Sequence, residues 1–304
     1  MTAGEWKGVI VAMITPLKDN GSRIDLDALD QYCDFLSSKG VHGVFCSGTT
    51  GEGPLLSLNE RKIVAERVVE RLKGKTRVIV HTGSITTADT IDLTRHACKI
   101  GADAAGVVLP YYYGYNDALL FEYFSAISDS IPGYPLFIYN IPQCTTNNLS
   151  LTLFEKLLVR IESIVGVKNS NPDIFQTIGF VKIAQGRCSV FLGCDSLILA
   201  GLSVGVRGVV SGNASAYPEP FVRIFAAHER DDLEEMREVQ RFIDRLIGVL
   251  AQGRDIASFK KALNLRGIPA GSVRGPDRDL SEEESKTLRE GLSGLGLLEH
   301  PEGR

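Results

Sequence analysis

The chain has 304 residues, of which 44% are hydrophobic and 23% are charged, a composition typical of globular proteins. Its 33 basic and 37 acidic side chains leave a net charge of −4, so we expect neither nucleic acid nor an anionic membrane as a partner. No run of 18 uncharged apolar residues occurs, and we therefore expect no membrane-spanning helix.

Residues that commonly bind metals or form disulfides show no recognised spacing. The six cysteines include no Cys-x-x-Cys pair, and the five histidines include no His-Glu-x-x-His. The first residues, Met1 to Lys7, lack the basic and then apolar pattern of a signal peptide. We therefore expect a cytoplasmic protein with no metal site and no disulfide framework.

Eight short apolar runs recur between amphipathic segments along the first 211 residues. They are continuous and mostly rich in Val and Ile, which is typical of parallel strands covered on both faces. The runs are residues 8–15, 43–47, 78–82, 104–109, 136–140, 164–168, 189–193 and 208–211.

Helix start signals lie between these runs. Ser57 and Glu60 form a capping-box pattern that predicts a helix through Leu72. Thr86 and Asp89 predict the start of the next helix. Eight strands alternating with helices predict an α/β fold, a (β/α)8 TIM barrel over residues 1–228. A doubly wound sheet is the alternative, but the Gly-x-Gly-x-x-Gly turn expected of a dinucleotide-binding one does not occur.

The strand pattern ends after residues 217–220. An apolar stripe from Leu233 to Leu250 predicts a long helix, and a second helix follows around residues 256–265. Ser281 and Glu284 form a second capping-box pattern, and the tail from Glu299 is expected to fray. Residues 229–304 are therefore predicted to form a C-terminal helical region packed on the barrel.

Functional groups of a barrel gather where its strands end, and Lys168 closes the apolar run 164–168. Burial disfavours the charged form of an amine, and the neutral amine can attack a ketone to form an imine. The protonated imine stabilises the carbanion made when a neighbouring C–C bond breaks or forms. A structural lysine paired with a carboxylate such as Asp195 is the alternative interpretation of the same position.

Two further strand ends carry hydroxyl groups. Tyr139 ends the strand before that of Lys168, so its phenol could act as a proton shuttle, or could simply be a core tyrosine. Residues 48–51, Gly-Thr-Thr-Gly, offer two hydroxyls and backbone N–H groups that could bind the carboxylate of a 2-oxo acid. The three tyrosines at 111–113 are more typical of packing or an oligomer contact.

With these motifs, the sequence resembles the dihydrodipicolinate synthase / N-acetylneuraminate lyase family of class I aldolases almost from end to end. The resemblance rests on residues 48–52 (Gly-Thr-Thr-Gly-Glu), 110–112 (Pro-Tyr-Tyr), 139–142 (Tyr-Asn-Ile-Pro) and 165–168 (Val-Gly-Val-Lys). It implies a (β/α)8 barrel, a homotetramer built from dimers, and a pyruvate-type substrate held as a Schiff base on Lys168. It implies no separate cofactor and no metal.

The resemblance also implies a role for individual residues. Tyr139 resembles the proton-transfer tyrosine, and Tyr112 resembles the tyrosine that reaches the neighbouring subunit's site. Thr49 and Thr50 resemble the threonines that bind the substrate carboxylate, and Thr49 also resembles a member of the proton relay. Gly193 and Val210 match positions whose backbone lines the pyruvate pocket. Asp195 stands where sugar-acid lyases place an acidic residue.

Two departures bear on the substrate. Cys144 stands where the synthases carry the arginine that binds the aldehyde's carboxylate, and a thiol cannot form a bidentate pair with that group. Ser196 stands where the sialic-acid lyases have a glutamate. The sequence therefore predicts a metal-free lyase that makes or consumes pyruvate, acting on a 2-keto-3-deoxy sugar acid or a similar hydroxy-oxo acid.

Three alternatives stay open at this point. The protein could be a true dihydrodipicolinate synthase, condensing pyruvate with aspartate semialdehyde despite Cys144. A metal-dependent aldolase would use His42 and His81. A non-catalytic barrel could sense a sugar acid, although sensing needs no nucleophilic lysine.

Overall fold

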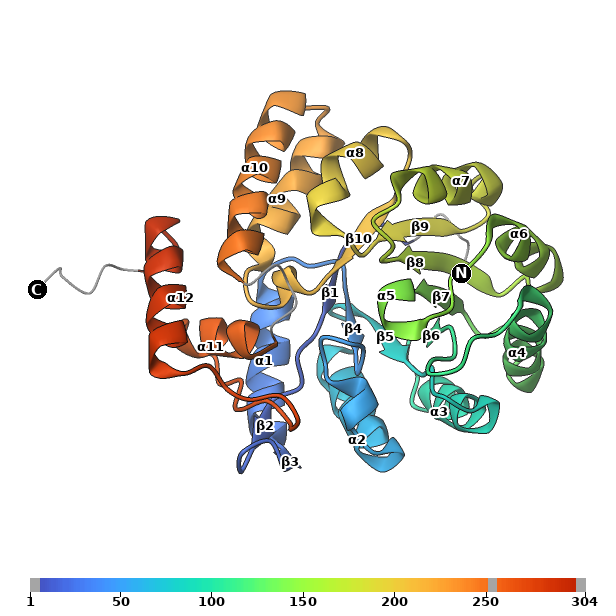
Figure 1. The fold of residues 1–304 in the computed structure, drawn as a ribbon, viewed down its shortest axis with the longest axis horizontal. Helices are drawn as coiled ribbons and strands as arrows, with labels where there is room; N and C mark the ends of the chain where they lie inside the picture. Colours follow the sequence, from blue (N-terminus) through green and yellow to red (C-terminus); the bar gives the residue numbers. More distant parts are fainter. Residues whose placement is uncertain (1–5, 251–255, 299–304) are drawn as a thin grey trace, which may run out of the picture.

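The computed structural model describes residues 6–250 and 256–298, and its parallel strands close into a barrel surrounded by helices (Figure 1). Each of the eight predicted apolar runs overlaps one barrel strand, with ends that differ by at most three residues, which confirms the (β/α)8 prediction. The barrel closes where β1 pairs with both β10 and β4. The barrel strands are β1 (Gly8–Ala12), β4 (Gly43–Cys46), β5 (Arg77–His81), β6 (Ala104–Val108), β7 (Leu136–Asn140), β8 (Ile164–Asn169), β9 (Ser189–Leu192) and β10 (Gly208–Ser211).

The helices begin where their caps predict. Ser57 accepts a hydrogen bond from the Glu60 N–H, and the Glu60 carboxylate accepts one from the Ser57 N–H, so the capping box of α2 is confirmed. Thr86 caps α3 through the Asp89 N–H. The outer helices are α1 (Leu26–Ser38), α2 (Leu58–Leu72), α3 (Thr87–Lys99), α4 (Asp117–Ser130), α6 (Leu151–Arg160), α7 (Ile174–Ala184), α8 (Ile198–Ser203) and α9 (Pro218–Glu229).

Large aromatic side chains fill the interior of the barrel. Phe137 and Phe191 contact each other edge-on, with ring centroids 5.7 Å apart. Gly166 of the next strand makes room for this packing, because a Cβ there would lie 2.2 Å from the Phe137 ring. Trp6 packs edge-on against Phe137 from the amino ends of the strands, at a centroid distance of 5.0 Å. The amino end of the barrel is therefore closed by side chains, which leaves the carboxyl end for chemistry.

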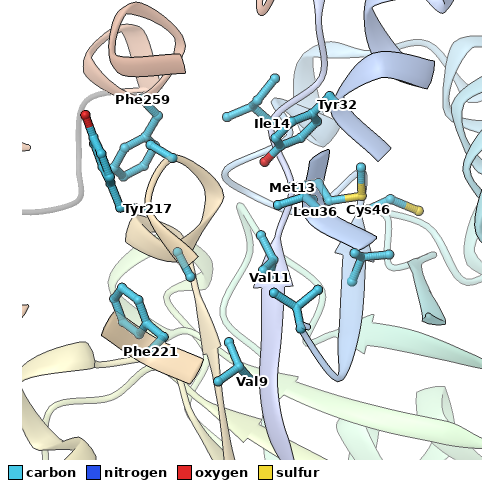
Figure 2. Packing of buried hydrophobic residues seen from close by; sticks show 14 of the residues in the cluster. Val9, Val11, Met13, Ile14, Tyr32, Leu36, Cys46, Tyr217, Phe221 and Phe259 are labelled. Carbon is cyan, nitrogen blue, oxygen red and sulfur yellow. The ribbon is translucent and has the colours of Figure 1, made fainter. Parts of the chain in front are cut away.

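The C-terminal helices share a core with the barrel. They are α10 (Leu233–Val249), α11 (Ile256–Leu265) and α12 (Glu282–Gly294), and they lie to one side of the barrel in Figure 1. Figure 2 shows Phe259 of α11 near Tyr217, in the same buried cluster as Val11 of β1. The division into a barrel of residues 1–228 and a C-terminal helical region of residues 229–304 packed on it stays a prediction, since α9 runs through the boundary.

Two small elements were not predicted. A two-stranded antiparallel sheet, β2 (Leu17–Lys18) with β3 (Arg23–Ile24), precedes α1, and the short helix α5 (Pro142–Thr145) follows β7. The tail from Glu299 lies outside the described residues. None of the described helices is both long enough and apolar enough to cross a membrane.

Candidate active site

Lys168 and Tyr139 lie side by side at the carboxyl end of the barrel. They are register partners on β8 and β7, and both side chains are buried. The Lys168 Nζ lies 3.9 Å from the centroid of the Tyr139 ring and 4.7 Å from that of Phe45. No ion pair joins Lys168 to Asp195 within the part of the chain that the structure describes, because Asp195 bonds to other groups. The geometry thus provides a buried amine between two aromatic rings at the barrel mouth.

The loop after β4 adds the hydroxyl groups predicted from the Gly-Thr-Thr-Gly motif. The Thr49 Oγ1 lies 3.2 Å from the Tyr139 hydroxyl, within hydrogen-bond distance. Thr50 faces the turn after β10, since its Oγ1 is 3.0 Å from the point that a Cβ on Gly212 would occupy. The Thr15 hydroxyl donates to the Gly51 carbonyl and fixes the loop against the segment after β1. Both predicted threonines therefore lie at the rim of the same barrel mouth.

Asp195 lies at the carboxyl end of β9 and is buried. Its Oδ2 accepts hydrogen bonds from the Ser211 hydroxyl at 2.6 Å and from the Asn213 Nδ2 at 2.7 Å, while its Oδ1 has no partner among the described residues. Burial raises the pKa of the Asp195 carboxyl above 3.8, and its two hydrogen bonds and the charge of Lys168 oppose that rise. Asp195 therefore keeps one unused acceptor oxygen within electrostatic reach of Lys168.

The remaining predicted site residues take two different positions. Val210 of β10 belongs to the interior cluster of the barrel, and Gly193, directly after β9, donates its N–H to the Asn169 carbonyl next to Lys168 at 2.7 Å. Tyr112 is 78% exposed, has a φ of +83°, and contacts Tyr113 edge-on. Tyr112 thus points to solvent in the single chain rather than packing beside Lys168.

Cys144, the departure noted at the sequence level, lies on α5 just beyond Tyr139. Burial raises the pKa of its thiol, and the positive charge of Lys168 opposes this rise, so the two side chains are electrostatic neighbours. The neighbouring Gln143 donates from its Nε2 to the Ser170 carbonyl. The exposed thiol therefore lies at the same end of the barrel as Lys168.

Two buried groups lie behind the loop of residues 47–52, the threonine loop: His81, which was predicted only for the metal-dependent alternative, and Arg61, which was not predicted. The His81 Nδ1 lies 3.0 Å from the Ser47 carbonyl, and the Arg61 guanidinium donates to the His81 carbonyl at 2.8 Å. Burial, followed by the charges of Arg61 and Lys168, holds the pKa of His81 well below 6.5. His42 lies at the opposite, amino end of the barrel, where its Nδ1 accepts from the Val9 N–H. The His42 and His81 pair of the metal-dependent alternative therefore does not form one site.

A network of side-chain amides, also missed, fixes the ends of β7 and β8. The Asn140 Nδ2 donates to the Oδ1 atoms of Asn169 and Asn148, each at 2.9 Å. The Asn169 Nδ2 donates in turn to the Thr177 hydroxyl at 3.1 Å. Asn140 and Asn169 directly follow Tyr139 and Lys168 in the sequence, so the signal was an asparagine after each of two neighbouring strand ends. The network holds the two strands at a fixed register where the site lies.

The fold and the buried lysine beside a tyrosine define the class, a (β/α)8 barrel with the groups of a Schiff-base aldolase. The chain matches the dihydrodipicolinate synthetase family over residues 5–294 and belongs to that family. It is a lyase of the pyruvate-dependent class I aldolase type.

Three relatives illustrate the similarity. The chain is 35% identical to the 4-hydroxy-tetrahydrodipicolinate synthase of Methanocaldococcus jannaschii, over 96% of this chain and 100% of that protein. YagE of Escherichia coli K12, solved in complex with pyruvate, is 26% identical with a TM-score of 0.91 over 96% and 99% of the two chains. A catalytic lysine mutant of the Ruminococcus gnavus sialic acid aldolase is 28% identical with a TM-score of 0.91 over 96% of each chain.

Proposed function

We propose that this lyase makes or consumes pyruvate through an imine on Lys168 and acts on a 2-keto-3-deoxy sugar acid or a similar hydroxy-oxo acid. The observation that carries the proposal is the position of the Lys168 Nζ, which is 3.9 Å from the Tyr139 ring centroid in a buried side chain. Asp195, the candidate counter-ion, is instead bonded to Ser211 and Asn213. An amine held in this way is available to a carbonyl carbon.

The proposed cleavage proceeds in steps whose atoms balance. The neutral Lys168 amine attacks the 2-oxo carbon, and loss of water gives the protonated imine. As the C3–C4 bond breaks, Tyr139, which has given its own proton to the departing water and is now a phenolate, accepts the C4 hydroxyl proton, with the Thr49 hydroxyl 3.2 Å away. The electron pair of that bond moves into the imine, which becomes an enamine, and an aldehyde leaves. Protonation at C3 and hydrolysis then release pyruvate and restore Lys168.

The two ends of the substrate would meet different surroundings. The hydroxyls of Thr49 and Thr50 would bind the carboxylate of the 2-oxo acid, together with backbone of Gly193 and Val210. The aldehyde portion would lie toward Cys144 and Asp195. The Asp195 Oδ1 has no partner among the described residues but is itself buried, so a sugar hydroxyl would reach it only if the side chains around it move.

The substrate class rests on Cys144. Without a cation at this position, an aldehyde that carries a carboxylate loses one charge-assisted pair, worth about 2–3 kcal/mol of binding. A polyhydroxylated aldehyde has no carboxylate to bind at this end. The second candidate is 4-hydroxy-tetrahydrodipicolinate synthase, which is supported by the name of the Methanocaldococcus jannaschii relative.

The imine can be tested directly. Reduction with borohydride in the presence of pyruvate should leave a covalent adduct on Lys168, detected by peptide mass mapping. Lys156, an exposed lysine on α6, serves as the internal control and should stay unmodified. An unmodified Lys168 peptide would refute the imine.

The substrate class needs a comparison of rates. Pyruvate release across a panel of 2-keto-3-deoxy sugar acids should exceed turnover of pyruvate with aspartate semialdehyde. In Cys144→Arg, we expect kcat/KM for aspartate semialdehyde to rise by about thirtyfold or more, as about 2 kcal/mol implies. Efficient turnover of aspartate semialdehyde by the unaltered protein would favour the synthase instead.

Assembly as a homotetramer, a dimer of dimers, and a cytoplasmic location stay predictions. If Tyr112 completes the site of a neighbouring subunit, mixed oligomers of Lys168→Met and Tyr112→Phe subunits should regain activity that neither variant has alone. Light scattering would give the oligomer size. A fully active monomer would contradict the shared site.

A further inference from the structure

A buried ion pair connects the threonine loop to the C-terminal helices. Glu52 ends the loop that carries Thr49 and Thr50, and its side chain has no exposed surface. Lys260 of α11 is equally buried, with its Nζ 2.5 Å from the Glu52 Oε2. Gln240 of α10 donates from its Nε2 to the Asp195 carbonyl at 3.1 Å, and the Glu52–Lys260 pair joins α11 to the threonine loop.

Backbone groups of the C-terminal segment, residues 256–298, make the other hydrogen bonds of Glu52 and Lys260. The Glu52 Oε1 accepts a hydrogen bond from the Arg274 N–H at 2.6 Å. The Lys260 Nζ donates to the Ser272 carbonyl at 2.7 Å. The Arg274 side chain also donates to the Leu55 carbonyl, on the far side of the loop. The loop is therefore held by the C-terminal segment through both Glu52 and Leu55.

Helix α11 supports the barrel mouth from a second direction. The Phe259 ring lies 3.6 Å from the point that a Cβ on Gly212 would occupy, and Thr50 Oγ1 approaches the same point to 3.0 Å. Phe259 and Lys260 are consecutive residues. One turn of α11 thus contacts both the turn that faces Thr50 and the loop that carries it.

Stability alone does not account for two charges in this position. Burial lowers the pKa of Lys260, although the Glu52 carboxylate opposes that shift. Removing two charges from water costs several kcal/mol for each ion, and well-packed apolar side chains of similar volume often stabilise a protein as well or better. An ion pair with fixed hydrogen bonds does, however, select one geometry of the segments that it joins.

We propose that Glu52 and Lys260 are positioning residues, which hold the threonine loop in the geometry that binds the substrate carboxylate. This inference rests on the proposed function, because it takes Thr49 and Thr50 as the groups that bind a 2-oxo acid. The C-terminal helices then contribute to substrate affinity without contacting substrate.

The test is the double variant Glu52→Gln/Lys260→Met, which removes both charges and keeps the size of both side chains. We expect KM for pyruvate, measured in the direction that condenses pyruvate with the aldehyde, to rise about tenfold or more while kcat changes by less than about threefold. Lys261→Met is the matched control, because it removes a charge from the next residue of the same helix without touching Glu52. It should leave both constants unchanged. A double variant that folds and keeps its KM within twofold of the wild-type value overturns the proposal.

The single variants separate positioning from folding. Each leaves an unpaired buried charge, so each should lose more thermal stability than the double variant. If the double variant does not fold, amide exchange in the wild-type protein provides the test. The N–H group of Gly53, which donates to the Gly48 carbonyl across the loop, and that of Arg274 should then open together, and independent exchange of the two would overturn the proposal.

The two proposals fail in different ways. If borohydride traps no pyruvate on wild-type Lys168, the proposed function fails before the ion pair is tested. If the wild-type protein traps pyruvate and the double variant requires no more pyruvate for half-maximal trapping, only the positioning role fails.

Discussion

Replacing Arg274 with Met should destabilise the protein through one identifiable ion pair. The Arg274 guanidinium donates to both carboxylate oxygens of Glu60, at 2.8 and 2.9 Å. It also donates to the carbonyls of Gly21, Ser22 and Leu55. The side chain therefore ties the C-terminal segment to the start of α2 and to the β2–β3 turn. Met retains the apolar stem and removes all of these donors.

The expected loss can be worked from the Glu60 pKa. The hydrogen bonds from Arg274 are the largest cause that lowers this pKa from 4.5 to about 2. That whole shift corresponds to about 3 kcal/mol and includes the hydrogen bonds from Ser57, so after solvent screening we assign at most about 2 kcal/mol to Arg274. A carboxyl group whose folded-state pKa is depressed stabilises the protein above its unfolded pKa, and this contribution disappears as the pH falls from 4.5 toward about 2.

Urea unfolding at pH 7 and at pH 3, at one protein concentration, measures both effects. The wild-type protein should lose more stability between these two pH values than Arg274→Met does. Arg278→Met is the control, because it removes a solvent-exposed bidentate ion pair with Glu284. Its urea unfolding midpoint should lie close to that of the wild-type protein. Equal pH dependence in the wild type and in Arg274→Met would refute the reasoning.

Three further variants test the site and the core. Tyr139→Phe should lower kcat by about 10²- to 10⁴-fold and still allow pyruvate to be trapped on Lys168, so loss of trapping would argue against a proton-transfer role. The folded-state pKa of Asp195 lies above its unfolded value of 3.8, so Asp195 stabilises the protein below pH 3.8 and loses this contribution as the pH rises through the raised pKa. Asp195→Asn should therefore reduce the loss of stability over this pH range, and an unchanged pH–stability curve would contradict the assignment. Phe137→Ala should cost about 3–5 kcal/mol in urea unfolding, because the ring fills the barrel interior, and a loss below about 1 kcal/mol would show that the interior collapses around the gap.

The elements that sequence predicted well are those with a local cause. A strand buried on both faces must be continuously apolar, and a capped helix start needs Ser57 and Glu60 three residues apart, so both patterns can be read within a few positions. The pairing of Tyr139 with Lys168 also followed, since consecutive parallel strands of a barrel place their carboxyl ends at one rim.

The contacts that sequence missed join residues distant along the chain. Nothing local to Glu52 indicates that its partner is Lys260, and the glutamate of the Gly-Thr-Thr-Gly-Glu motif was interpreted only as part of the family resemblance. The contacts of Arg274 were missed for the same reason, because a loop rich in Gly and Pro has no periodicity. Tertiary contacts of this kind become visible only when the chain is folded.

The site therefore depends on two kinds of support. Lys168 and Tyr139 are fixed by the sheet itself, through their register and through the amides of Asn140 and Asn169. The threonine loop is outside the sheet and is held both by Thr15 and by residues of the C-terminal segment. Changes in the sheet should therefore affect the chemical step, whereas changes in α11 should affect how tightly the substrate carboxylate is bound. On this proposal, a (β/α)8 barrel with the catalytic groups on its strands depends on the helices that follow it for substrate affinity.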